Sequence, residues 1–169
     1  MSAGQSASPP SAITFRPIAA GDEAFLFSVY ASTRADELAP VPWSEEQKRA
    51  FLGMQFQAQH RFYLENFPAC DYLVVLRDGR PAGRLYVDRR PDEIRLIDIA
   101  LLPEHRGAGI GTALLRQLFA EATAAAKPLR IHVERFNPAL RLYSRLGFTQ
   151  VADEGVYLLM EWRPGEAPG

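Results

Sequence analysis

The chain has 169 residues, of which 47% are hydrophobic and 23% are charged, and its formal net charge is −1. This length suits one domain with a hydrophobic core and is too short for two domains of ordinary size. The small net charge predicts no general attraction to nucleic acid or to anionic membranes, so any anion site must be a local feature.

The cysteine content and the N-terminal residues bear on the cellular compartment. The single cysteine, Cys70, cannot form an internal disulfide, which suits a reducing compartment. No apolar run approaches the roughly 18 residues that span a bilayer. The N-terminal residues lack the basic-then-apolar pattern of a signal peptide. We therefore expect a cytoplasmic protein that does not contact membranes.

The first part of the chain predicts one strand and two helices after a flexible tail. Residues 1–12 are mainly Ser, Ala, Gly and Pro, with no apolar face to bury. A strand is expected at residues 13–17, and a helix begins near Gly21 with apolar residues at helical spacing. Ser44 and Gln47 match the S-x-x-Q capping box, which predicts a second helix of about twenty residues.

Three strands are expected next, at residues 72–77, 82–88 and 94–102. Asp78-Gly79 between the first two is typical of a tight hairpin turn, because both positions accept a positive φ. The three strands therefore predict an antiparallel meander.

The remaining elements place a helix between two strands. We expect a helix at 109–126, a strand at 129–134, a short helix at 138–146 and a closing hairpin at 149–152 and 156–162. Asn137 is a natural N-cap for the short helix and Pro138 a natural first residue. Residues 164–169 resemble the N-terminal tail, so one domain is expected over residues 13–163.

The strand–helix–strand crossover requires one parallel pair of strands in an otherwise antiparallel sheet. The pattern thus predicts a mixed α/β fold, with a central sheet of about six to seven strands and about four flanking helices.

The hexapeptide from Arg106 to Gly111 is a candidate anion site. Its glycines, at positions 107, 109 and 111, leave main-chain amides uncovered and permit positive φ. The following helix directs its N-terminal amides and its positive dipole end to the same place. A diphosphate is the expected ligand.

Spacing excludes two common nucleotide sites. A dinucleotide fingerprint, G-x-G-x-x-G, would need a third glycine where this chain has Thr112. The phosphate loop of nucleoside triphosphatases needs Gly-Lys-Ser/Thr, and no lysine follows Gly111.

The remaining pattern, R-G-A-G-I-G preceded by L-P-E-H, resembles the acyl-CoA diphosphate loop of the GNAT superfamily of N-acetyltransferases. Downstream, the segment from Val133 to Phe148 contains Asn137, Ala139 and Tyr143 followed by L-G-F. It resembles the second signature of that family, N-x-x-A-x-x-x-Y followed by L-G-F. The two motifs together cover residues 94–148.

This resemblance implies an enzyme that moves an acetyl group from acetyl-CoA to a primary amine by direct attack in a ternary complex, with no metal. A non-catalytic acyl-CoA-binding or sensor module is the alternative. The resemblance also implies a parallel pair of strands that splays apart to admit the cofactor arm. The implied cofactor-binding residues are Ile99, Ala100, Leu101, Arg106, Gly107, Ala108, Gly109, Ile110, Gly111, Thr112, Asn137 and Tyr143.

The resemblance makes Tyr143 the candidate acid beside the departing sulfur; the alternative is an aromatic side chain packed on the sheet. The base is less defined. Alternation along residues 94–102 places Asp98 on one face with Ile94, Leu96 and Ala100, where a carboxylate must be paired or functional. Asp98 is thus either a base or amine anchor, or an ion-pair partner of an arginine or histidine. The reserves are Glu134, Glu93 and His132.

The acceptor and the oligomeric state have no motif of their own. The first half of the chain offers residues for an aromatic pocket that binds a cation, with core and helix packing as the alternative. Its candidate residues are Trp43, Phe51, Phe56, Tyr63, Tyr72 and Tyr86, with Asp36, Glu37 or Asp88. The acceptor is expected to be a small-molecule amine (a metabolite, an amino acid or an aminoglycoside-like compound) or a peptide or protein amine.

Cys70 could be a nucleophile only with a nearby base. A homodimer is expected if the closing hairpin, ending at Met160, Glu161 and Trp162, provides a free edge.

Overall fold

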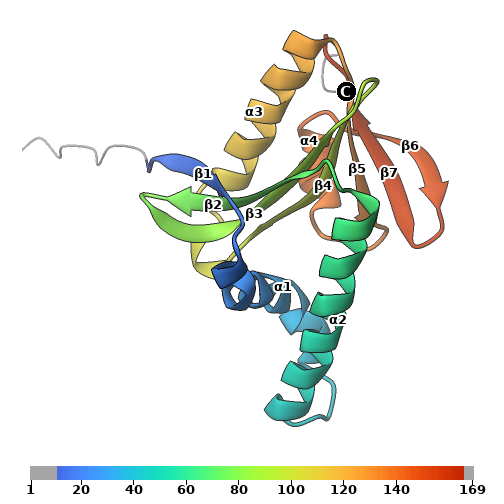
Figure 1. Cartoon of the computed structure of the whole chain (residues 1–169). Helices are drawn as coiled ribbons and strands as arrows, with labels where there is room; N and C mark the ends of the chain where they lie inside the picture. Colours follow the sequence, from blue (N-terminus) through green and yellow to red (C-terminus); the bar gives the residue numbers. More distant parts are fainter. Residues whose placement is uncertain (1–10, 166–169) are drawn as a thin grey trace, which may run out of the picture.

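The computed structural model describes residues 11–165, which form a seven-stranded sheet with helices on both faces (Figure 1). The strands are β1 (Ile13–Pro17), β2 (Asp71–Arg77), β3 (Arg80–Arg89), β4 (Ile94–Leu101), β5 (Leu129–Glu134), β6 (Thr149–Glu154) and β7 (Tyr157–Trp162). The helices are α1 (Glu23–Leu38), α2 (Glu45–Asn66), α3 (Ile110–Ala125) and α4 (Leu140–Arg145), with short 3₁₀ turns at Ala20–Asp22 and Pro103–His105.

The strands lie in the order β1-β2-β3-β4-β5-β7-β6, and β4 and β5 are the parallel pair. Every other neighbouring pair is antiparallel. The predicted mixed fold is therefore confirmed. Most of the two expected tails, residues 1–10 and 166–169, lies outside the described residues, and the expected domain limits remain a prediction.

Local sequence signals explain several element ends. The Gln47 amide donates to Ser44 Oγ at 3.1 Å and the Ser44 amide donates to Gln47 Oε1 at 2.9 Å, which is the predicted capping box. Asp78 and Gly79 have φ of 51° and 80°, as a tight hairpin turn requires.

The expected N-cap at Asn137 needs a correction, because α4 begins only at Leu140. Asn137 Oδ1 does accept the Ala139 amide at 2.9 Å, so it makes a capping bond to the preceding turn.

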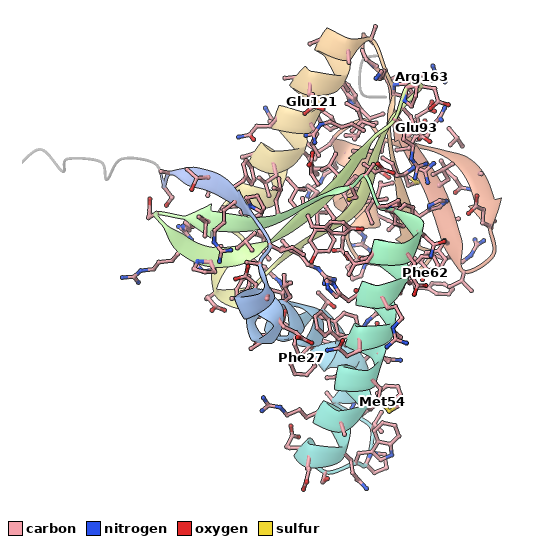
Figure 2. The ribbon with its side chains drawn as sticks, viewed as in Figure 1. Phe27, Met54, Phe62, Glu93, Glu121 and Arg163 are labelled. Carbon is pink, nitrogen blue, oxygen red and sulfur yellow. The ribbon has the colours of Figure 1, made fainter. Side chains whose placement is uncertain are left out.

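Two apolar clusters pack the helices. The larger one packs α3 and α4 against one face and includes Leu114, Leu118 and Phe148. The smaller one joins α1 and α2 through Leu26, Tyr30, Leu52 and Phe56. The N-terminal half of α2 projects beyond the sheet, and Met54 points away from the body of the molecule there (Figure 2).

A β-bulge in β4 corrects the predicted face of Asp98. Tyr86 of β3 pairs with Asp98 but Val87 pairs with Leu96, so Ile97 is an extra residue. Leu96 packs in the larger apolar cluster, beneath α3, whereas Asp98 is on the opposite face and contacts Tyr63 of α2. The prediction that Asp98 shares a face with Ile94 and Leu96 was wrong, because one bulged residue reverses the alternation.

The parallel pair is closed at one end and open at the other. Only Ile94, Arg95 and Leu96 of β4 pair with β5, opposite Leu129, Arg130 and Ile131. Beyond them the two strands separate in a V, as the family resemblance implied.

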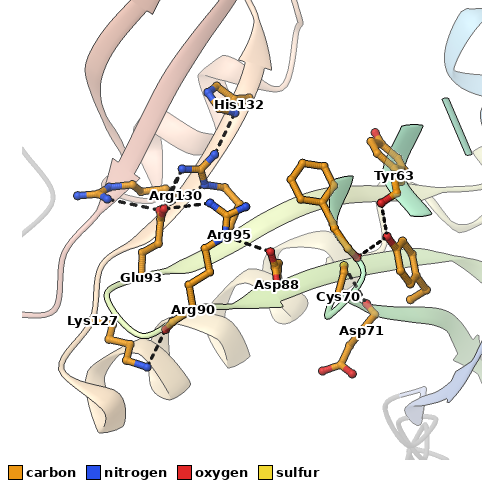
Figure 3. A network of polar contacts seen from close by, with 12 residues as sticks. Tyr63, Cys70, Asp71, Asp88, Arg90, Glu93, Arg95, Lys127, Arg130 and His132 are labelled. Atoms are coloured by element: carbon orange, nitrogen blue, oxygen red, sulfur yellow. Dashed lines mark hydrogen bonds and ion pairs between the residues drawn. The ribbon is translucent and has the colours of Figure 1, made fainter. Parts of the chain in front are cut away.

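A charged network ties the closed end of the V (Figure 3). The buried Glu93 carboxylate contacts Arg95 of β4 at 2.9 Å and Arg130 of β5 at 3.4 Å. Arg130 also pairs with Glu161 of β7 at 2.7 Å. Three strands are thus joined by ion pairs where the sheet remains continuous.

The closing hairpin has a free edge at β6, because β7 lies between β5 and β6. The expected edge is therefore confirmed, although Met160 and Glu161 of β7 are buried within the sheet. A homodimer at this edge remains a prediction. None of the helices in residues 11–165 combines the length and apolar character needed to cross a membrane.

Candidate active site

The glycine-rich turn presents an unusually long run of free amides. Gly107 and Gly109 have φ of 75° and 80°, in the left-handed region that favours glycine. Within residues 11–165, the six consecutive amides from Gly107 to Thr112 have no hydrogen-bond acceptor. An ordinary helix leaves four such amides. The turn and the start of α3 therefore form a neutral cradle suited to a diphosphate.

Arg106 connects this turn to two other elements. Its Nε donates to the carbonyl oxygen of Leu101, at the end of β4, at 3.0 Å. Its Nη2 donates to Ser32 Oγ of α1 at 3.1 Å. Arg106 thus holds α1 beside the glycine-rich turn, a contact that sequence reasoning did not predict.

The open end of the V forms a cleft of about 640 Å³, a volume typical of sites for small molecules. Residues 97–101 and 131–134 line its two walls, and side chains from all four helices complete it. Of the expected cofactor residues, Ile99, Ala100, Leu101, Arg106, Gly111, Asn137 and Tyr143 line the cleft. Gly107, Ala108, Gly109, Ile110 and Thr112 belong to the adjoining cradle, outside the cleft lining.

Tyr143 of α4 is buried, and its ring packs edge-on against Phe148. Burial raises the pKa of its hydroxyl to about 12, and the negative charge of Asp98 adds to the effect. The hydroxyl is therefore protonated at neutral pH, and it has no hydrogen-bond partner within the described part of the chain.

Within residues 11–165, only one of the two carboxylate oxygens of Asp98 accepts hydrogen bonds. Arg84 Nη2 and Tyr63 Oη both donate to its Oδ2 atom, each at 2.9 Å. Gln59 Oε1 accepts from Arg84 Nη2 at 3.0 Å, and the Arg84 side chain is only 4% exposed. The predicted ion pair with an arginine is confirmed. Since Asp98 Oδ1 has no partner among residues 11–165 and Asp98 lines the cleft, this oxygen is available to a ligand.

The reserve candidates occupy three different positions. Glu134 lies at the end of β5 and pairs with Arg34 of α1 at 3.2 Å, within the cleft. His132 also lines the cleft, between Arg95 at 3.2 Å and Glu154 at 3.0 Å. Glu93 does not line the cleft, because it belongs to the network at the closed end of the V.

Helix α1 bridges the open V. Ser32 contacts Arg106, which follows β4, and Arg34 contacts Glu134, which ends β5. The two walls of the cleft are therefore both tied to one helix turn. Sequence reasoning missed Ser32, Arg34 and Gln59, because helical spacing identifies the buried stripe of a helix but not the polar contacts of its edges.

The proposed aromatic pocket does not form as a unit. Tyr63, Asp36 and Glu37 line the cleft, but the other candidates lie outside its lining. Those residues are Trp43, Phe51, Phe56, Tyr72, Tyr86 and Asp88. Cys70 is outside the cleft as well, and burial raises the pKa of its thiol to about 12, which disfavours a thiolate nucleophile.

The residue spacing around Asn137 corrects one part of the motif assignment. Tyr143 follows Asn137 by six positions, whereas N-x-x-A-x-x-x-Y requires seven. Phe136 therefore occupies the asparagine position, while Ala139 and Tyr143 fit the pattern.

Within residues 11–165, no group of three or more His, Cys, Asp or Glu side chains is arranged to hold a metal ion.

Comparison with known proteins agrees with this geometry. The sequence profile of the acetyltransferase (GNAT) family matches residues 26–148. A Bacillus subtilis protein that is named a ribosomal protein bS18-alanine N-acetyltransferase is 36% identical over 87 residues. That alignment covers 50% of this chain and 56% of the relative, so the match spans little more than half of the relative's length.

Two solved structures have the same fold. One is the PaiA N-acetyltransferase of Thermoplasma acidophilum in complex with coenzyme A, with a TM-score of 0.67, 19% identity, and coverage of 90% of this chain and 99% of that one. The other is the ribosomal-protein-S18-alanine N-acetyltransferase of Escherichia coli, with a TM-score of 0.61, 20% identity, and coverage of 92% and 96%.

Proposed function

Because the chain belongs to the acetyltransferase (GNAT) family, we propose that it transfers an acetyl group from acetyl-CoA to a primary amine by direct attack in a ternary complex. The observation that carries this proposal is that an anion-binding turn and two candidate catalytic side chains adjoin the same cleft. The run of free amides from Gly107 to Thr112 adjoins the open edge of β4, and Tyr143 and Asp98 line the same cleft.

The amide run fits the diphosphate of coenzyme A, and its neutral donors need no lysine to bind an anion. Ile99, Ala100 and Leu101 have no partner on β5, so their main-chain groups can pair with the amide-bearing arm of the cofactor as a neighbouring strand would. Asn137 and Tyr143 line the same cleft and complete the proposed cofactor site.

The chemistry requires a neutral amine, which attacks the thioester carbonyl as the carbon–sulfur bond breaks. We assign Asp98 Oδ1 to the amine, because Asp98 lines the cleft and its other oxygen, Oδ2, is held by Arg84 and Tyr63. The carboxylate receives the proton that the amine loses. Tyr143 gives its proton to the departing sulfur, and its raised pKa keeps that proton available at neutral pH.

The acceptor we propose is the N-terminal amine of a polypeptide. Support comes from the name of the Bacillus subtilis relative, which specifies an alanine of a ribosomal protein. Alanine has no side-chain amine, so within a polypeptide only an N-terminal alanine can be N-acetylated. A reducing, cytoplasmic setting agrees with the single buried Cys70.

Two measurements test the proposal in sequence. Acetyl-CoA at about 100 times its dissociation constant should raise the melting temperature by roughly 5–10 °C, since binding adds about 2.7 kcal/mol. Thiol release from acetyl-CoA should then depend on an added alanine-initiated peptide. A melting shift without amine-dependent thiol release would support the non-catalytic binding module instead, and no shift at millimolar acetyl-CoA would contradict both.

A further inference from the structure

Three large apolar side chains are exposed next to the cleft, and two of them, Phe136 and Tyr157, line it. Phe136 is 91% exposed, Val156 is 69% exposed and Tyr157 is 46% exposed, and none belongs to either apolar cluster. Phe136 lies between β5 and α4, whereas Val156 and Tyr157 lie at the turn between β6 and β7. We call these three residues the apolar rim.

Arg135 fixes the two parts of the rim to each other. Its amide donates to the carbonyl oxygen of Val156 at 2.9 Å, and its Nε donates to the carbonyl oxygen of Gly155 at 3.0 Å. Arg135 also pairs with Asp153 of β6. The rim is therefore a preformed surface on two connected turns.

The register of the sheet places the rim on the acceptor side of the cleft. Tyr157 pairs with Glu134 across β5 and β7, so both side chains leave the same face of the sheet. Glu134 contacts Arg34 of α1 on that face, and Asp98 contacts Tyr63 of α2 there. Phe136 and Tyr157 line the cleft itself.

An exposed ring that packs against nothing in the free protein gains stability only when a ligand covers it. The cleft of about 640 Å³ has to hold the thioester arm and the attacking amine, so a longer acceptor must leave it at the mouth. On α1, the exposed Asp36 also lines the cleft, whereas the neighbouring Glu37 is paired with Arg34 at 3.3 Å. The charge of Asp36 complements an ammonium group and repels an anionic acceptor.

Resting on the proposed function, we infer that the apolar rim binds the residues that follow the N-terminal amine of a polypeptide acceptor, with an apolar side chain of that segment packed on Phe136. Phe136 is thus a specificity-determining residue. It selects a chain over a free amine and an apolar second or third residue over a polar one.

The test compares alaninamide with two hexapeptides that begin with alanine, one with leucine and one with serine at positions two and three. At saturating acetyl-CoA, the leucine peptide should have the largest kcat/KM, and Phe136→Ala should reduce that value roughly tenfold, as expected for a well-buried contact residue. The loss should appear mainly in KM. The effect on alaninamide should be much smaller.

Met54→Ala is the matched control, because Met54 is 71% exposed on α2 and does not line the cleft (Figure 2). It should leave all three substrates unaffected. Both variants replace exposed side chains, so their melting temperatures should stay near that of the wild type.

A binding measurement keeps this inference separate from the proposed function. Calorimetric titration of the leucine hexapeptide into the protein with coenzyme A needs no turnover, and Phe136→Ala should weaken that binding. If the wild type binds the peptide but transfers no acetyl group, the proposed function is contradicted, whereas peptide binding at the rim is supported. Three results would overturn the rim assignment. One is an equal kcat/KM for the leucine hexapeptide and alaninamide. The others are a Phe136→Ala effect confined to acetyl-CoA affinity and a dimer that Phe136→Ala dissociates.

Discussion

The hydroxyl of Tyr143 can be removed without leaving another buried group unpaired, since it has no hydrogen-bond partner in residues 11–165. Tyr143→Phe should therefore keep the melting temperature and the dissociation constant of acetyl-CoA close to the wild-type values. If the hydroxyl protonates the departing sulfur, kcat should fall by about 100-fold or more. Calorimetry and a thiol-release assay measure the two quantities, and an unchanged kcat would remove Tyr143 as the acid.

Asp98 neutralises the buried Arg84, which is a structural role, and it is also proposed to accept the proton of the amine. Variants of the Arg84–Asp98 pair can distinguish the two roles. Asp98→Asn leaves the Arg84 guanidinium, whose side chain is 4% exposed, without its charged partner. Removing one member of a buried ion pair destabilises a protein by about 3–5 kcal/mol. Urea denaturation should show a loss of that order, together with a higher KM for the amine.

The double variant Arg84→Met/Asp98→Asn decides between the two roles. Removing both charges should restore much of the free energy of unfolding, because no uncompensated charge remains. Acetyl transfer should stay low, since Oδ1 no longer carries a carboxylate charge toward the amine. Recovery of activity together with stability would show that Asp98 serves only to neutralise Arg84.

At the scale of single elements, replacing two glycines of the glycine-rich turn should change the stability of the free protein in opposite directions. Gly109 has φ of 80°, so Gly109→Ala should destabilise the free protein by about 1–2 kcal/mol. Gly111 lies inside α3 without positive φ, and an added Cβ would meet no atom within 4 Å. Gly111→Ala should therefore stabilise the free protein by up to about 1 kcal/mol.

Both glycine variants should nevertheless weaken acetyl-CoA binding. Gly109→Ala disturbs the direction of the turn amides, whereas Gly111→Ala adds a methyl group to a position that lines the cleft. Melting curves with and without acetyl-CoA measure both effects. Normal cofactor affinity in the two variants would argue against a diphosphate at this turn.

Element positions were predictable because apolar periodicity and turn residues are local signals. The Ser44 capping box and the Asp78-Gly79 turn are examples, since each depends on a few adjacent residues. The face of Asp98 was not predictable, because the bulge at Ile97 arises from pairing with β3 rather than from the β4 sequence. The polar contacts of Ser32 and Arg34 likewise depend on where α1 crosses the V.

Across the whole molecule, one end of the V is fixed by charge and the other is left open for ligands. Glu93, Arg95 and Arg130 join the strands where β4 and β5 still pair (Figure 3). Glu161 of β7 extends this network through Arg130. At the open end α1 connects the same two strands, through Ser32 with Arg106 and Arg34 with Glu134. The glycine turn indicated the ligand site from sequence, but only the assembled sheet reveals why a cleft opens beside it.

The closed-end network predicts a specific loss of stability in acid. Burial by itself would raise the pKa of Glu93, but hydrogen bonds and charges from Arg95, Arg130 and Arg90 outweigh it and hold that pKa below the ordinary value of 4.5. Burial is likewise outweighed at Glu161, where Arg130 and Arg163 lower the pKa. Both carboxyls therefore bind protons more weakly in the folded state than in the unfolded state.

Their stabilisation is fully present above about pH 4.5 and is lost as the pH falls through the lower, folded-state pKa values. The melting temperature should thus fall steeply on acidification below pH 4.5. Glu93→Gln should be less stable at pH 7, where it forfeits the ionised contacts, and its melting temperature should fall less steeply in acid. Parallel melting curves from pH 3 to pH 7 measure the difference, and identical slopes for variant and wild type would show that Glu93 does not contribute to acid sensitivity.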